Sequence, residues 1–352
     1  MRKWNYIVVF ILMGSFLAAQ DMHFSQFNET PALVNPALTG ADGPLKIAVI
    51  NKDQWKSVTS AFRTYGATFE TRIALSGKAD KGRSTVSKQK VFNGINAGLS
   101  FFSDKTGDGA LTTNKINLSI STFLALNKSN FISVGIQNSY IQRKVNAGNF
   151  IFPDQYNGSI YDPNLKSNES FATQSYFYMD AAAGVMWSYD HNQKNFDVAN
   201  QFRSHLGFSV YHLTKAKDQF LFPGADSYLR YVAHGDLVKS LGKSNLAIAP
   251  SFLLQFQGPS TEILIGTLLK HSFKGNSKYT GKNRRNSFGY GVFYRNKDAV
   301  VLSAVIELAE QYTVVFGYDV NISGLRSASS YRGGFEIGLK YTRAKPTLYQ
   351  KK

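Results

Sequence analysis

The sequence predicts an all-β protein: a transmembrane antiparallel β-barrel of about 14 strands with an irregular N-terminal extension. Apolar and polar residues alternate over long segments such as 116–126 and 132–139, and side chains on a strand point to opposite faces with a period of two. Charged residues in these segments fall almost entirely on one of the two faces. Beyond the N-terminal region, no apolar run approaches the roughly eighteen residues of a membrane helix. These three observations favour a barrel with a lipid-facing and a lumen-facing side.

Residues 1–19 have the features of a secretory signal peptide. Two basic residues precede an apolar core at 6–17, which is followed by a pair of alanines. We expect cleavage after Ala19, which makes Gln20 the first residue of the exported chain. The sequence contains no cysteine, so lipoprotein processing, disulfides and thiolate chemistry are excluded. Export together with a strand-rich sequence points to the outer membrane of a bacterium.

Residues 20–44 differ from the rest of the chain because they show no periodicity. Pro31, Pro36 and Pro44 constrain the backbone, and the apolar residues in this segment are more numerous than in a disordered tail. We expect the segment to pack into or across the periplasmic mouth of the barrel, where Asp21 and His23 present polar groups together with Gln26. The residues predicted to form a plug or a partner-binding surface are Asp21, His23, Phe24, Ser25, Gln26, Phe27, Asn35 and Pro36.

The barrel is expected to occupy residues 45–343, with a basic tail at 344–352. The predicted strands are 46–55, 62–75, 94–104, 113–127, 131–144, 176–190, 202–214, 229–241, 245–257, 261–273, 286–296, 299–308, 311–320 and 331–342. Most have ten residues or more, whereas strands of globular proteins average roughly five or six. A strand that crosses a membrane needs roughly 9–11 residues. A soluble β-sandwich would have shorter strands.

The alternation assigns one set of side chains to lipid and another to the lumen. The residues predicted to face lipid include Leu118, Ile120, Val134, Ile136, Ile248, Phe252 and Ile337. The residues predicted to form a polar network in the lumen are Glu70, Arg72, Arg230, His234, Asp236 and Glu336. Buried charges without partners are costly, so these groups are expected to pair in a partly filled lumen. The short links 258–260 and 296–298 cannot supply a plug, which must come from elsewhere.

The lengths of the links predict how the barrel is oriented. If both ends of the barrel are periplasmic, the tight links 127–130, 242–244 and 309–310 lie in the periplasm and the longest link, 145–175, lies outside. Outer-membrane barrels show this asymmetry. The links 76–92 and 275–285 are long for periplasmic turns and depart from the rule.

Motifs that carry chemistry are weak in this sequence. Residues 104–109 resemble the start of a calcium loop, but Lys115 stands where the loop needs its glutamate. None of the six histidines pairs with another at metal-ligand spacing. His234 shares the inward face with two charged residues, where a hydrogen-bond network is a commoner role than acid–base catalysis. We therefore predict no catalytic, cofactor-binding or metal site, and a protein that is not an enzyme.

The formal net charge of +17 is compatible with nucleic acid, acidic lipid or an acidic protein partner, and identifies none of them. The basic residues at 282–285 and 351–352 lie near tyrosines. Nucleic-acid binding also needs a groove with stacking platforms, and an exported barrel rarely meets nucleic acid. Solvated turns or periplasmic contacts are the favoured interpretation.

Several sequence blocks resemble the PorP/SprF family, which belongs to the type IX secretion and gliding machinery of Bacteroidota. The chain opens after the leader with Gln-Asp-Met-His-Phe-Ser-Gln-Phe at 20–27, followed by Leu-Val-Asn-Pro-Ala-Leu-Thr-Gly at 33–40. The remaining blocks lie at 51–55, 65–69, 230–234, 250–255, 316–323 and 332–336. The resemblance covers essentially the whole chain after the leader, with the blocks in the same order.

The resemblance implies an outer-membrane barrel that works with the secretion machinery and catalyses no reaction. The partners that it implies are a secreted adhesin or other cargo with a C-terminal sorting domain, periplasmic components of the secretion system, and outer-membrane lipid. Two functions remain open. The barrel either assists the secretion or surface attachment of a cargo protein, or it is a passive diffusion channel whose basic lumen favours anions. Residues 20–44 discriminate between them, because a simple porin does not require such a segment.

Overall fold

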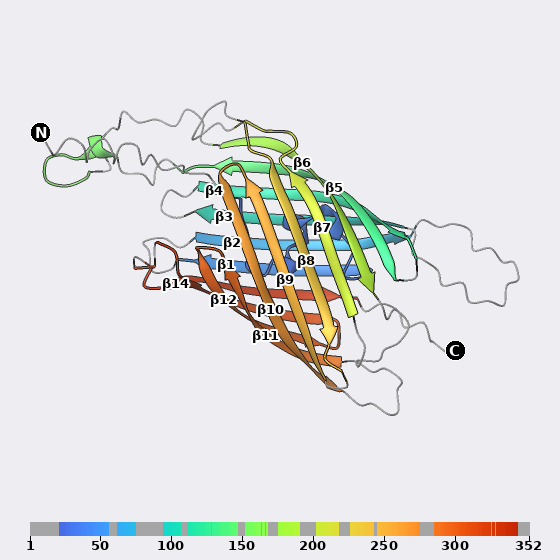
Figure 1. The fold of residues 1–352 in the computed structure, drawn as a ribbon. Coiled ribbons are helices and arrows are strands. Elements are labelled where there is room, and N and C mark those ends of the chain that lie inside the picture. Colours follow the sequence, from blue (N-terminus) through green and yellow to red (C-terminus); the bar gives the residue numbers. More distant parts are fainter. Residues whose placement is uncertain are drawn as a thin grey trace, which may run out of the picture.

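The computed structural model describes residues 21–55, 62–74, 94–106, 111–127, 129–146, 152–162, 164–165, 167, 175–190, 202–217, 226–242, 245–274, 285–324, 326–327 and 329–343. Within these residues, fourteen antiparallel strands form a closed barrel, in which each strand pairs with its neighbours in sequence and β1 pairs with β14 (Figure 1). The prediction of an all-β barrel is confirmed. The predicted leader 1–19, Gln20, the tail 344–352 and the links 76–92 and 275–284 lie outside the described residues, as do residues 107–109 of the calcium-like motif.

The strands are longer than those of globular proteins and lie close to the predicted segments. In chain order they are β1 (Leu45–Gln54), β2 (Phe62–Ala74), β3 (Gly94–Thr106), β4 (Leu111–Ala125), β5 (Asn130–Lys144), β6 (Ser175–Asp190), β7 (Phe202–Tyr211), β8 (Arg230–Ser240), β9 (Leu246–Gln257), β10 (Ser260–Lys274), β11 (Arg285–Arg295), β12 (Ala299–Leu308), β13 (Tyr312–Asn321) and β14 (Arg332–Thr342). The prediction that the seventh strand continues to residue 214 is wrong. This strand ends at Tyr211 because His212 adopts a left-handed backbone conformation, with φ at 63°.

Side chains alternate between the outer and inner faces along each strand. Leu118 and Ile136 are 59% and 61% exposed, whereas Asn117 and Gln137, their neighbours in sequence, are buried. The other residues predicted to face lipid lie on the more exposed parity of their strands: Ile120, Val134, Ile248, Phe252 and Ile337. The outer face is therefore an apolar band and the inner face is largely polar, as in membrane-spanning barrels.

The two ends of the barrel differ in the links that they carry. We call the end that holds Leu45 and Thr342 the C-terminal rim, and the opposite end the far rim. Links that follow odd-numbered strands lie at the far rim, including the long links 145–174 and 212–229. Longer loops mark the outer side of outer-membrane barrels, so we expect the far rim at the cell exterior and the C-terminal rim in the periplasm, although the link 75–93 at the C-terminal rim is also long.

Residues 21–44 lie inside the barrel, and we call this segment the plug. It forms the short helices η1 (Phe27–Glu29), α2 (Pro31–Val34) and η2 (Pro36–Leu38), drawn in dark blue within the ring of strands in Figure 1. A proline occupies the first turn of α2 and of η2, where its missing N–H and fixed φ favour the helix start. Helix η2 packs against β4, β5 and β6.

The plug runs along the lumen from one rim toward the other. Asp21 contacts His212 and Arg230 at the far rim, whereas Pro44 leads directly into β1 at the C-terminal rim. The structure places Asp21 at the rim opposite Leu45 and Thr342, and the placement of Asp21, His23 and Gln26 at the periplasmic mouth stays a prediction. Their partners are charged groups at the far-rim ends of the strands and in the middle of the lumen.

Two apolar clusters attach the plug to the wall. Phe27 and Val34 pack among buried residues of β6 to β13 such as Leu253 and Phe293. Phe24, Ala32 and Leu33 form a second cluster with Ile50 and Phe102 of the wall. Burying a large apolar side chain stabilises by roughly 1.5–3 kcal/mol, so these residues fix the plug before any polar contact is counted. No helix in the described part of the chain is long and apolar enough to cross a membrane.

Candidate functional site

Asn35 is the central polar anchor of the plug and is fully buried. Its side-chain oxygen accepts a hydrogen bond from the Ala37 N–H at 2.9 Å, which caps the start of η2. Its amide nitrogen donates to the Val185 carbonyl at 3.0 Å and lies 3.0 Å from Nε2 of His234. The carbonyl of Phe208 is a further, longer partner. One plug side chain is thereby bonded to three consecutive strands, β6, β7 and β8.

Glycines in the wall create the space that the plug occupies. A side-chain carbon added at Gly184 would clash with the Asn35 side chain, and one added at Gly135 would clash with the backbone of Pro36. The plug approaches the strands so closely at these two positions that only glycine fits. Ser133 and Ser209 next to them donate to the carbonyls of Ala37 and Val34 at 2.7 Å and 2.6 Å. The wall is therefore shaped for this segment.

Glu336 of β14 binds the backbone of the plug. Its two carboxylate oxygens accept hydrogen bonds from the N–H groups of Ser25 at 2.8 Å and Gln26 at 3.0 Å. Lys52 of β1 lies 3.2 Å from the same carboxylate and also donates to the His23 carbonyl. Both Glu336 and Lys52 are almost completely buried. A buried carboxylate with two backbone donors and a lysine is well compensated, whereas its removal would leave an uncompensated charge.

A second acidic group holds Ser25 from the side. The Ser25 hydroxyl donates to the Asp319 carboxylate at 2.9 Å and contacts the guanidinium of Arg295. Arg295 in turn lies 3.1 Å from Asp319 and 2.9 Å from Asp298. Gln26 reaches the hydroxyl of Ser303 at 2.7 Å. The first half of the plug thus joins β1 and the strands β11 to β14.

The second half of the plug is also held by β2 and β4. The N–H of Gly40 donates to Glu70 at 2.8 Å, and its carbonyl accepts two hydrogen bonds from the Arg72 guanidinium at 2.7 Å and 3.0 Å. Thr39 donates to Ser119 at 2.9 Å, and its carbonyl accepts from Ser121 at 2.7 Å. Backbone groups that have no partner within the short helices are thereby satisfied by the wall.

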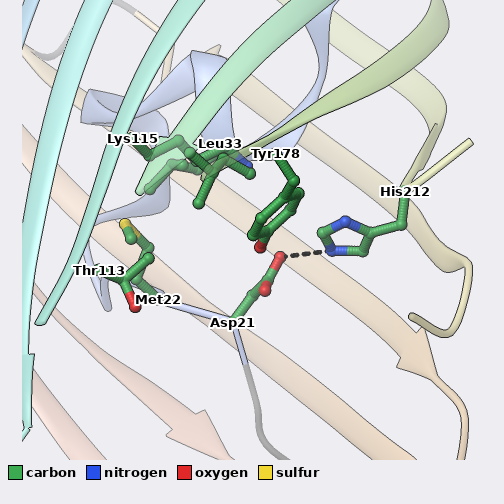
Figure 2. A pocket seen from close by; sticks show the side chains of 8 residues that line it. Asp21, Met22, Leu33, Thr113, Lys115, Tyr178 and His212 are labelled. Atoms are coloured by element: carbon green, nitrogen blue, oxygen red, sulfur yellow. Dashed lines mark hydrogen bonds and ion pairs between the residues drawn. The ribbon is translucent and has the colours of Figure 1, made fainter. Parts of the chain in front are cut away.

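Asp21 fixes the start of the plug at the far rim (Figure 2). Its carboxylate lies 2.8 Å from Nε2 of His212 and 3.4 Å from Nη1 of Arg230. Asp180 lies 2.9 Å from the other ring nitrogen of His212. Arg230 also donates to the Leu33 carbonyl at 3.2 Å. Figure 2 shows Asp21 facing His212, with Tyr178 beside them, at a small cavity that Lys115 also lines.

The two ends of this ion pair influence each other's protonation. Burial alone would lower the pKa of His212, but the carboxylates of Asp21 and Asp180 outweigh it and raise this pKa above its ordinary value. Burial alone would raise the pKa of Asp21, but the cationic His212 and Arg230 hold it well below its usual range. Both groups are therefore stabilised in their charged forms when the plug is in place.

The structure places the predicted plug residues together inside the lumen. Phe24, Ser25, Gln26, Phe27, Asn35 and Pro36 are buried, and Asp21 and His23 are half-buried. Five of the predicted lumen residues, Glu70, Arg72, Arg230, His234 and Glu336, contact the plug directly. Asp236 does not, and pairs instead with His205 at 3.0 Å.

Sequence reasoning missed several residues that hold the plug. The missed residues on the strands are Lys52, Arg295, Ser303 and Asp319, all at inward positions. The alternation of side chains identifies them as lumen residues but does not reveal that they contact the plug. His212 follows the end of its strand, where parity gives no information. Among the described residues, no group of three or more acidic or histidine side chains is arranged to hold a metal ion.

Comparison with known proteins matches one family over most of the chain. Residues 16–341 match the family described as type IX secretion system membrane protein PorP/SprF. A search of the curated proteins finds no match. Similar solved structures include the CymD monoaromatic hydrocarbon channel, with 9% identity, a TM-score of 0.40 and coverage of 90% of this chain and 93% of that one. The KdgM porin in complex with disordered oligogalacturonate has 9% identity, a TM-score of 0.37 and coverage of 85% of this chain and 99% of that one.

Proposed function

Because the chain belongs to the PorP/SprF family of type IX secretion system membrane proteins, we propose that it assists the secretion or surface attachment of a partner adhesin or other cargo by protein–protein binding. It is an outer-membrane barrel of that secretion system. The proposed cargo carries a C-terminal sorting domain and meets the barrel at the far rim. Periplasmic components of the secretion system meet the C-terminal rim.

The observation that supports a binding role is the occupied lumen. The plug is hydrogen-bonded or ion-paired to strands around the barrel, from Lys52 of β1 to Glu336 of β14. Asn35 and Pro36 fill spaces that glycines leave in the wall. A barrel whose interior is committed to its own N-terminal segment offers its rims and outer face as working surfaces, rather than a wide aqueous path.

The alternative, a passive channel with a basic lumen, requires the plug to leave. Several buried charges of the wall, including Glu336 and Arg230, have the plug as a partner, and removing one partner from a buried pair costs roughly 3–5 kcal/mol. Release of the whole segment would expose several such groups at once. The structure therefore favours binding over diffusion.

The proposal includes export with a cleaved leader. Cleavage after Ala19 leaves Gln20 immediately before the first residue of the plug. Because Asp21 lies at the far rim, the plug then starts on the side expected to face the cell exterior. N-terminal sequencing of the protein from outer membranes should begin at Gln20. A sequence that begins at Met1 would contradict cleavage.

The test of the function compares surface proteins in three strains of the native host. One strain has an intact chromosomal copy, one lacks the gene, and one carries the deletion together with the wild-type gene on a plasmid. We expect cell-surface biotinylation and mass spectrometry to show loss of one or a few proteins with C-terminal sorting domains in the deletion strain, and their return on complementation. An unchanged surface proteome in the deletion strain would contradict the proposed function.

A further inference from the structure

Strand β6 extends beyond its neighbour β7 at the far rim. The ladder between them includes Ala183 opposite Val210 and runs from there toward Asp190 and Arg203 at the C-terminal rim. One further bond, from the Leu213 N–H to the Ala181 carbonyl at 3.1 Å, continues the contact. The chain then turns away, with left-handed backbone conformations at His212 and Lys215. The first part of β6, residues 175–179, therefore projects past the end of β7.

Two backbone hydrogen bonds establish which way the N–H and C=O groups of this part point. The Asp190 N–H donates to the Ser129 carbonyl on the side of β5, and the Ala181 carbonyl accepts on the side of β7. The register between β5 and β6 has no shift from one end to the other. Because successive residues of a strand direct their N–H and C=O groups to opposite sides, the odd-numbered residues 175, 177 and 179 direct theirs away from β5.

Local side chains form hydrogen bonds with only some of the backbone groups on this edge of β6. The Thr214 hydroxyl donates to the Met179 carbonyl at 3.0 Å, and the Asp180 carboxylate accepts from the Ala181 N–H at 2.9 Å. In the part of the chain that the structure describes, no strand pairs with Ser175 or Phe177 on that side. Unpaired strand edges do not occur in the hydrocarbon region, and proteins usually cover or interrupt them.

We propose that residues 175–179 of β6 receive an extended segment of the secreted partner, which adds to the barrel wall as a strand. Strand addition supplies main-chain hydrogen bonds to an exposed edge and selects alternate side chains by neighbouring pockets. The exposed, apolar side chains of Phe177 and Met179 point outward here and favour an apolar residue at every second position of the incoming segment. The identity of the partner rests on the proposed function. The unpaired edge of β6 follows from the pairing of β6 with β5 and β7.

The test uses proline to remove one edge donor. Phe177→Pro deletes an N–H that faces away from β5, so the ladder between β5 and β6 keeps its donors. Phe177→Ala is the matched control, since it removes the same ring but keeps the N–H. Both are expressed in the deletion strain as full-length protein, and folding is checked by heat-modifiable migration in gels. We expect Phe177→Pro to reduce surface display of the proteins lost in the deletion strain by at least about fivefold, and Phe177→Ala to retain it within about twofold.

A second variant covers the case in which Phe177→Pro does not fold. Ser175→Pro lies at the first residue of β6, where proline is tolerated, and it removes the next donor of the same edge. Normal display with a folded proline variant would overturn the inference while leaving the proposed function intact. If the gene deletion changes no surface protein, the proposed function itself fails, and the two failures are thereby distinguished.

A photo-crosslinking amino acid at position 179 identifies the occupant directly. We expect a crosslink to one of the proteins whose display depends on the barrel. A crosslink to a second copy of this chain would show self-association through the edge and overturn the assignment to a secreted partner. No crosslink in cells that display the cargo normally would also overturn it.

Discussion

Asp21 and His212 make the attachment of the plug dependent on pH. The pKa of His212 is raised in the folded protein, so its contribution is complete below the ordinary histidine value of about 6.5 and is lost as the pH rises through the folded-state pKa. The pKa of Asp21 is lowered, so its contribution is present above the ordinary value of about 4 and is lost as the pH falls through the folded-state pKa. Asp180, Arg230 and Lys115 are the charged neighbours of the pair.

We therefore predict that the start of the plug loosens when the pH rises above the folded-state pKa of His212. Hydrogen exchange at residues 22–24, corrected for the intrinsic rate, should accelerate across this range in the wild-type protein. His212→Gln removes the titrating group, and its corrected exchange should be faster at low pH and independent of pH through the same range. Identical pH profiles in the two proteins would contradict the role of His212.

Glu336 is the residue whose loss should damage the plug attachment most. Glu336→Gln leaves Lys52 without its carboxylate and turns an NH₂ group toward backbone donors that need an acceptor. We expect a loss of roughly 3–5 kcal/mol in the free energy of unfolding, the usual result of breaking a buried pair. Denaturant titration in lipid vesicles measures it, with Glu310→Gln in an exposed turn as the control. Equal stabilities of the two variants would show that Glu336 contributes nothing beyond an ordinary surface charge.

At the scale of the elements, strands β5 and β6 are matched to helix η2 by the glycines that face it. Gly184→Ala introduces a carbon into the position of the Asn35 side chain, and overpacking of this kind costs roughly 1–3 kcal/mol. We predict that the plug shifts while the strands stay paired. The protein has no cysteine, so Ala32→Cys in the buried helix α2 serves as a reporter.

Maleimide labelling of this reporter should be slow in the otherwise wild-type protein and faster with Gly184→Ala. Gly289→Ala is the control, because its added carbon would meet nothing closer than the flexible side chain of Lys270 at 3.3 Å. Equal labelling rates in the two glycine variants would mean that the close approach at Gly184 does not hold the plug.

The outer face of β4 tests the placement of the barrel in lipid. Ile120 is 51% exposed in the middle of this strand, and an arginine near the bilayer centre costs roughly 2–4 kcal/mol. Leu126 is also exposed but lies in the turn at the C-terminal rim, where the same change should cost roughly 0–1 kcal/mol. Unfolding in lipid vesicles compares Ile120→Arg with Leu126→Arg. Equal effects would place β4 outside the bilayer.

The alternation of apolar and polar side chains was sufficient to predict the strands, because every second side chain of a barrel strand points into the lumen. It predicted Leu118 and Ile136 as outward residues and Glu70 and Glu336 as lumen residues. It could not predict the early end of β7, since the left-handed turn at His212 is not required by any glycine or proline in the sequence there. The open edge of β6 follows from that turn and was therefore also hidden.

At the scale of the whole molecule, the sequence predicted a plug but not its path. Residues 21–44 have no periodicity, so their position depends on matching particular groups in three dimensions. The fit of Asn35 beside Gly184 involves residues about 150 positions apart, and a single sequence carries no signal for it. Charged residues occur toward both rims, such as Lys46 and Arg230, so the charge of Asp21 alone did not select the far rim.

We propose that the barrel is closed by its own N-terminal segment and works as a binding component of the secretion system. Single-channel recording of the purified full-length protein in planar lipid bilayers tests it most directly. The occupied lumen predicts that inserted barrels show no large, steady conductance. A large conductance that persists in every inserted barrel would show an open lumen, contradict the plugged structure and support a passive channel.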